Sequence, residues 1–414
     1  MQGKKLGPVK KITYTVMVGF VFFSYVLNRY KIIFPMSILT LLMLNMFYTK
    51  RGNAVTSSLK YLFPWIFCIY INIIGLIKTT NRIEAASYLG MLLLLILLTY
   101  FVDNNVNWVN WIYKLFIVCG GIHTIATILQ LIIPKVINKF CGFFLTSGSY
   151  SANVWQYNNG KLAGITGQVG ANAFYIGILI GIIFIEIKFI ENIKKNKMIL
   201  YILWGITYFA LILTTKRGEL IFSVLSIIII YYNGRKKNTK IYISFCIILF
   251  ILGLVFFFYE NNVSIDIVEL NNYSSGRINI YMDTINSIKK SPIIGNGLLI
   301  TKSLFEINSH NIYLQIFNEL GILGLIIYLF TFLYELKKSF SIYNYLIKEK
   351  NNAAKYACFS IYSQLFFLLC GFVANPLYDN FMLLEYMISI MIIRAININI
   401  KFQISKVENI ERTI

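Results

Sequence analysis

One segment, residues 309–324, holds the clearest set of groups that could do chemistry. It opens with Ser309 and His310, one of only two histidines in the chain, and continues as an apolar helix. A polar stripe on that helix is formed by Asn311, Gln315, Asn318 and Glu319. Polar groups are costly in hydrocarbon, so they usually face a bundle interior or a wet cavity. We therefore expect a polar cavity where this helix begins.

His310 is the candidate general base of that cavity. Nearby cations would lower its pKa and keep the imidazole neutral, so that it could accept a proton. The alternative is an interfacial histidine that only hydrogen-bonds a backbone carbonyl. Glu319 lies on the opposite helix face and about two and a half turns deeper. We therefore expect Glu319 to anchor the stripe inside the bundle rather than to orient the imidazole.

Two arginines could form an anion site. Arg217 follows Lys216 in residues 214–218, which predict a tight turn between two apolar stretches. Arg277 stands where a loop helix is expected to begin, and an anion there would gain the helix dipole and a bidentate guanidinium fork. The alternatives are an Arg217 that snorkels to the membrane interface and an Arg277 that is simply solvated.

Other polar residues have supporting or structural interpretations. Lys216 and Asn311 are expected to help bind the substrate. Asp379 could cap the helix that follows it or act as a second candidate base. His123 lies in the middle of an apolar stretch, where we expect a packing or hydrogen-bonding role.

A membrane-spanning bundle must position these groups. The chain has 414 residues, is 57% hydrophobic and has a mean hydropathy of +0.67, and a helix needs roughly 20 apolar residues to cross the hydrocarbon core. About twelve spans are predicted, near residues 12–28, 32–48, 59–77, 83–102, 111–133, 168–187, 198–215, 218–232, 240–259, 310–334, 353–374 and 379–397. The seventh and eighth are short and could be partly re-entrant. The sequence predicts an all-α polytopic membrane protein, with residues 1–414 as a single membrane domain.

The net charge of +21 is distributed as membrane topology requires. With the N-terminus in the cytoplasm, most of the 38 lysines and arginines fall in segments on the cytoplasmic side. This distribution favours the positive-inside rule over nucleic-acid binding. It places both termini in the cytoplasm and His310, Arg217 and Arg277 on the outer side.

Two large extracytoplasmic loops are predicted, at residues 134–167 and 260–309. The second should contain an amphipathic helix at about residues 277–290, because apolar residues recur there at helical spacing. We expect this helix to lie at the outer membrane–water boundary. Gly295 and Gly297 should form the turn that follows it.

Together these residues resemble a known family signature. The matching positions are Ser275-Gly276-Arg277, Tyr281, Pro292, Gly295, Gly297, His310-Asn311, Leu314, Glu319, Gly321 and Gly324. They resemble the O-antigen ligase and O-antigen polymerase superfamily over about residues 205–330. Residues 215–218 resemble that family's Ser-Arg-Gly turn, and residues 164–172 its earlier glycine and asparagine motif. Tyr281 stands where the family often has tryptophan, and Lys216 where serine is common.

The resemblance implies a GT-C-type glycosyl transfer that needs no metal or cofactor. The donor would be a glycan on undecaprenyl diphosphate, the acceptor a sugar hydroxyl, and the location the outer face of a bacterial cytoplasmic membrane. Expected partners are the lipid-linked glycan and membrane lipid, with a chain-length regulator and a flippase as further candidates. No nucleic-acid partner is expected.

We therefore expect a polymerase that joins oligosaccharide repeat units into surface polysaccharide, either O-antigen or capsule. By inference, Arg217 and Arg277 hold the diphosphate and His310 deprotonates the acceptor, while Lys216, Asn311, Tyr281 and Asp379 bind substrate. A ligase of the same superfamily, which moves finished glycan to a lipid or protein acceptor, is the first alternative. A lipid or polysaccharide transporter is the second, although no inverted repeat is evident.

Overall fold

The computed structural model describes residues 6–27, 33–49, 55–102, 106–190, 194–233, 276–305 and 308–411. These residues form helices and connecting turns, with no strand among them. The predicted span at 240–259, the first part of the loop that follows it, and Ser274 and Ser275 lie outside the described residues.

The helices follow one another along the described part of the chain with short connections. They are α1 (Pro8–Phe23), α2 (Ile33–Thr49), α3 (Val55–Lys78), α4 (Arg82–Tyr100), α5 (Asn107–Ile132), α6 (Pro134–Phe144), α7 (Ser147–Asn158), α8 (Val169–Phe189), α9 (Lys194–Leu213), α10 (Arg217–Asn233), α13 (Arg277–Ile288), α14 (Ile300–Phe305), α15 (Ile312–Lys348), α16 (Ala354–Cys370), the 3-10 helix η2 (Pro376–Tyr378) and α17 (Asn380–Glu411).

The prediction of an all-α polytopic membrane protein is confirmed. Six described helices are long and apolar enough to cross a membrane, and three shorter apolar helices accompany them. Eleven of the predicted spans correspond to helices of this structure. The short pair α9 and α10 consists of continuous helices. The predicted outer loop at 134–167 contains the helices α6 and α7.

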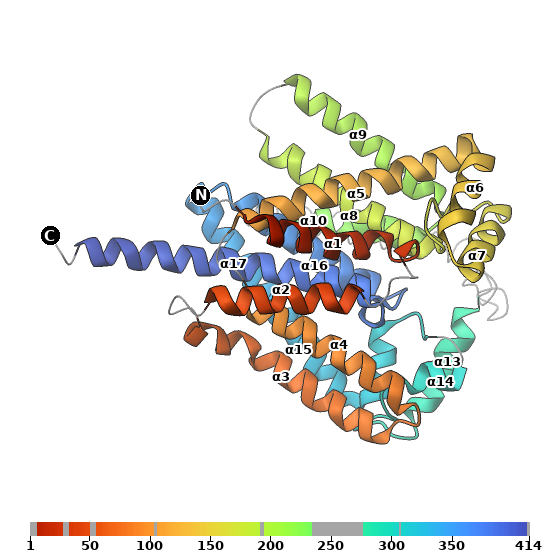
Figure 1. Ribbon diagram of the computed structural model, residues 1–414. Helices are drawn as coiled ribbons and strands as arrows, with labels where there is room; N and C mark the ends of the chain where they lie inside the picture. Colours follow the sequence, from red (N-terminus) through yellow and green to blue (C-terminus); the bar gives the residue numbers. More distant parts are fainter. Residues whose placement is uncertain are drawn as a thin grey trace, which may run out of the picture.

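The long helices form a bundle whose two ends differ (Figure 1). The short helices α6, α7, α13 and α14 gather at one end, shown at the right. The beginning of α1 and the end of α17 lie at the other. Helices α8, α16 and α17 are the most enclosed, because most of their apolar side chains are buried inside the bundle.

Helix α15 bends where it contacts the turn that follows α13. Gly321 has φ 71° and ψ −173°, which breaks the helical path. The backbone of the turn approaches so closely that a β-carbon on Gly321 would meet the carbonyl of Ile293. The turn also satisfies the backbone groups that the bend frees, since Gly297 N donates to Glu319 O (3.0 Å) and Ile322 N donates to Pro292 O (2.9 Å).

The loop helix expected at 277–290 is confirmed as α13. Gly276, with φ 81°, occupies the N-cap position of this helix. The predicted turn glycines Gly295 and Gly297 have φ 73° and 118°, conformations that favour glycine. Helix α13 packs against α15, so the turn and the bend fix α13 to the helix that follows His310.

A buried ion pair ties the long helices together inside the bundle. Arg394 on α17 donates to Glu335 on α15 at 2.6 Å and to the carbonyl of Thr99 on α4 at 3.0 Å. Trp65 on α3 also donates to Glu335 (3.1 Å). Both charged side chains are almost fully buried. Four helices are therefore joined by this ion pair and the hydrogen bonds around it.

Candidate functional site

A large cavity opens at the end of the bundle where α7 and α13 lie. It has a volume of about 990 Å³. Its lining comes from segments far apart in the sequence: the end of α1, α7, the start of α8, the turn before α10, α13 and the segments before α15 and α17. The sequence-predicted residues that line it are Lys216, Arg217, Arg277, His310 and Asp379.

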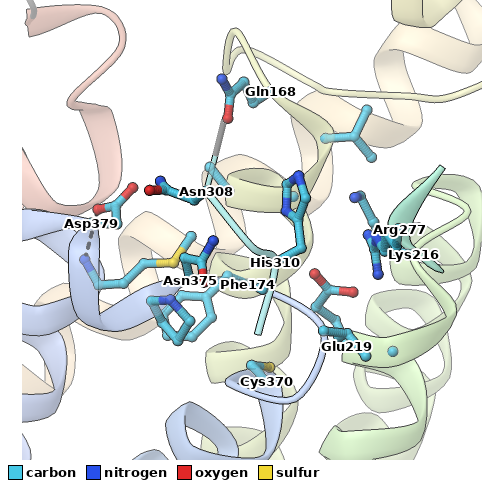
Figure 2. A pocket seen from close by; sticks show the side chains of 18 of the residues that line it. Gln168, Phe174, Lys216, Glu219, Arg277, Asn308, His310, Cys370, Asn375 and Asp379 are labelled. Carbon is cyan, nitrogen blue, oxygen red and sulfur yellow. Dashed lines mark hydrogen bonds between the residues drawn. The ribbon is translucent and has the colours of Figure 1, made fainter. Parts of the chain in front are cut away.

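The backbone around His310 is held in an unusual conformation. His310 has φ 54°, a left-handed conformation that is uncommon outside glycine. Asn311 caps α15, since its Oδ1 accepts from the backbone N–H groups of Tyr313 (3.0 Å) and Leu314 (3.1 Å). Ile312 N donates to the carbonyl of Gly371 at 2.8 Å. These contacts fix the turn and direct His310 into the cavity (Figure 2).

The polar stripe of α15 supports the same turn from inside the bundle. Gln315 and Glu319 are fully buried. Gln315 Nε2 donates to Asn308 Oδ1 (3.2 Å) and to Glu319 Oε1 (2.9 Å). Tyr378 Oη donates to Glu319 Oε2 at 3.0 Å. The prediction that Glu319 anchors the stripe is confirmed.

The cavity has an excess of basic side chains. Five lysines or arginines line it, against two carboxylates, Glu219 and Asp379. Lys216 and Arg277 lie beside each other on one side of His310, with Glu219 close by (Figure 2). Burial, followed by the Arg277 and Lys216 charges, lowers the pKa of His310. The imidazole is therefore favoured in its neutral form.

The turn between α9 and α10 presents two of these cations. Thr215 has φ 58°, and the Thr214 hydroxyl accepts from Lys216 N at 3.3 Å. A β-carbon on Gly218 would lie 2.6 Å from a methyl group of Val373, so glycine permits this turn to pack against the segment after α16. The predicted tight turn is confirmed. Burial is the main cause that lowers the pKa of Lys216, while Glu219 opposes it.

Asp379 caps a helix, as one of its two predicted roles requires, and it also lies in the cavity. Its Oδ1 accepts from the backbone N–H groups of Phe381 (2.9 Å) and Met382 (3.1 Å), which caps α17. The same side chain lines the cavity. Burial raises the pKa of this carboxyl, and its two backbone hydrogen bonds oppose the shift.

Two predicted residues lie beside the cavity rather than in its lining. Asn311 uses its side-chain oxygen as the helix cap. Tyr281 Oη donates to the backbone carbonyl of His310 at 3.4 Å, which links α13 to the His310 turn.

The other histidine, His123, is fully buried, and its Nε2 lies 2.8 Å from the Phe22 carbonyl. The predicted packing and hydrogen-bonding role of His123 is confirmed.

Several lining residues escaped the sequence analysis. Glu219 could have been recognised from the sequence as a partner for the charges of Lys216 and Arg217, because it follows Arg217 by two residues. The sequence does not single out four other lining residues, because they are ordinary polar residues near helix ends: Tyr25, Gln168, Asn308 and Asn375. They reach the cavity only through the packing of α1, α8, α15 and α17.

Among the described residues, no three His, Cys, Asp or Glu side chains come together as a metal site would require.

The fold and cavity define a class: a helical membrane protein with a basic cavity at one end of its bundle and a histidine inside it. Residues 200–329 match the family model described as O-Antigen ligase. This segment therefore carries the domain of the O-antigen ligase and polymerase superfamily, and it contains Lys216, Arg217, Arg277 and His310. A search among curated proteins finds no match.

Proposed function

We propose that the protein polymerises oligosaccharide repeat units, carried on undecaprenyl diphosphate, into surface polysaccharide by inverting glycosyl transfer. One observation carries the proposal: three cations and His310 line a single cavity within a segment that matches the O-Antigen ligase model. A diphosphate leaving group needs fixed positive charge, and a sugar hydroxyl needs a base. The cavity offers both.

In the proposed reaction, Lys216, Arg217 and Arg277 bind the donor diphosphate. The acceptor hydroxyl oxygen attacks the anomeric carbon of the donor sugar from the side opposite the diphosphate. The bond between that carbon and the diphosphate oxygen breaks, and the diphosphate leaves with the electron pair. The hydroxyl proton passes to the neutral His310 imidazole. The cations stabilise the charge that grows on the leaving oxygen.

The proposal places the cavity on the outer face of the cytoplasmic membrane. Two features support it: the basic residues concentrate in the segments assigned to the cytoplasm, and the beginning of α1 and the end of α17 lie at the end of the bundle opposite α13 (Figure 1). A lipid-linked donor needs access from the bilayer and a glycan needs water, and the edge of a bundle meets both requirements.

The decisive experiment incubates the purified protein with lipid-linked repeat units extracted from cells that lack it. A ladder of longer glycans on the lipid carrier is the expected product. A reaction in which finished glycan moves to a different lipid or protein, with no ladder, would reject the polymerase and favour the ligase. The ligase remains the second candidate because the matching model bears that description. Movement of labelled lipid-linked sugar across a vesicle membrane without extension would favour a transporter.

A further inference from the structure

One wall of the cavity is built from amides rather than cations. Gln168, Asn308 and Asn375 line this wall, with Tyr25 beside them. In Figure 2 the three amides lie on the opposite side of His310 from Arg277. The wall draws its residues from the N-cap of α8 and from the segments before α15 and η2. We call these three residues the amide wall.

Asn375 has the most informative environment. Its side-chain nitrogen and oxygen are both buried, and neither has a hydrogen-bond partner in the part of the chain that the structure describes. Its backbone carbonyl accepts from Tyr378 N at 3.1 Å, so the residue is held at the start of η2. Proteins seldom bury an amide without partners, because each unmet group costs free energy. A ligand or water in the cavity would supply those partners.

The other two amides already use their oxygens. Gln168 Oε1 accepts from Tyr25 Oη at 3.1 Å. Asn308 Oδ1 accepts from Gln315 Nε2 at 3.2 Å. Each side chain is thereby oriented, and its N–H groups are the end left for a ligand. The amide wall thus offers fixed donors together with the donor and acceptor of Asn375.

We infer that the amide wall is the binding site for the acceptor sugar. Sugar hydroxyls both donate and accept hydrogen bonds, which matches neutral amides, whereas a diphosphate would be held by the cations across the cavity. His310 lies between the two walls and can reach a hydroxyl held on one side while the diphosphate is held on the other (Figure 2). This inference rests on the proposed glycosyl transfer and adds the residues that select the acceptor.

The test separates the two walls with two probes. One is inorganic pyrophosphate, and the other is the free oligosaccharide released by mild acid from the lipid-linked pool of cells that lack the protein. Binding of each to the purified full chain is measured by calorimetry. Asn375→Ala and Gln168→Ala should each weaken oligosaccharide binding about tenfold, the loss expected for one hydrogen-bonding amide. Their affinity for pyrophosphate should not change.

Asn110→Ala is the matched control. Its exposed amide accepts from Tyr356 Oη at 3.1 Å and lies at the other end of the bundle, beside a second cavity. That variant should bind both probes as the wild type does. Oligosaccharide binding that survives in both Asn375→Ala and Gln168→Ala would overturn the inference, as would a wild type that does not bind the oligosaccharide. Gln168 is exposed, so its variant remains informative even if Asn375→Ala does not fold.

The glycan ladder distinguishes this inference from the proposed function. A wild type that binds the oligosaccharide through the amide wall but makes no ladder would reject the polymerase and retain the sugar site. A wild type that makes a ladder with undiminished efficiency after Asn375→Ala and Gln168→Ala would retain the polymerase and reject the sugar site.

Discussion

The two arginine sites of this protein differ in how their charges are balanced. Arg394, inside the bundle, donates to Glu335 and Thr99, so its charge is met by protein groups. Arg277, in the cavity, lies beside Lys216, and basic side chains outnumber carboxylates in that lining. A buried pair that is complete within the protein holds helices together, whereas an excess of like charge at an opening calls for an anionic ligand. The comparison predicts that substitutions of the buried pair lower stability, whereas substitutions in the cavity lower activity.

The largest effect is expected from His310→Ala. Loss of a general base should reduce glycan polymerisation by about 10²- to 10⁴-fold, while the amount of protein in the membrane stays normal. The ladder assay and immunoblotting of membrane fractions measure the two quantities. Undiminished polymer in this variant would remove His310 from the mechanism.

Substitution of Arg394, in the ion pair inside the bundle, should lower the stability of the protein. Arg394→Ala leaves the Glu335 carboxylate buried without its partner, which should lower the free energy of unfolding by about 3–5 kcal/mol. Thermal unfolding in detergent measures the loss. A double variant, Arg394→Met with Glu335→Leu, should recover most of it because neither member of the pair is then left buried without the other. If Arg394→Ala instead abolished turnover without lowering stability, the contrast between the two sites would be wrong.

Arg277→Lys tests the cavity site with charge retained. An ammonium keeps the positive charge but lacks the planar fork that binds two phosphate oxygens. We expect turnover to fall by about 10- to 100-fold, which corresponds to the roughly 1.5–3 kcal/mol of a hydrogen bond to a charged group. Thermal stability should be unchanged. Full turnover in this variant would argue against a bidentate role.

Gln315→Leu tests whether the buried hydrogen bonds of Gln315 position the turn that carries His310. The substitution removes the bonds from Gln315 to Asn308 and Glu319, although Gln315 itself does not line the cavity. We expect kcat to fall about tenfold, because one modest hydrogen bond positions the turn, with little change in KM for the donor. A rise in donor KM at constant kcat would show that Gln315 acts on binding instead.

The smallest effect concerns pH. Burial and the nearby cations lower the pKa of His310, so the base is neutral above that pKa and protonated below it. Activity should therefore be flat through neutral pH and should fall only below the ordinary histidine value of about 6.5. A profile of kcat/KM against pH measures this limb. A limb above that value would show that His310 is not the titrating base.

Much of the fold followed from hydropathy. The α8 span, predicted at 168–187, is found at Val169–Phe189, because a long apolar run has few alternatives in a membrane. Helix α15 was underestimated, since the prediction ended at 334 and the helix continues to Lys348. Its second half carries Glu335 and Lys338, and sequence alone does not show that Arg394 meets that carboxylate. Polar residues there lowered the hydropathy without ending the helix.

Only part of the candidate site could be predicted from the sequence. His310 and Arg277 stood out because charged or titratable groups at the ends of apolar stretches are rare. The amide wall could not be found, because amides near helix ends are common and only tertiary packing brings Gln168 to Asn375. The bend at Gly321 was also missed, because a glycine in an apolar stretch does not reveal that the turn after α13 will contact it.

The backbone contact between that turn and Gly321 has a mechanical consequence. It joins α13, which begins with Arg277, to the part of α15 that follows His310. Backbone contacts backbone there, and no flexible side chain lies between the two segments. Main-chain contacts therefore fix the spacing between Arg277 and His310, so the proposed phosphate anchor and the proposed base should stay at one separation whatever glycan is bound.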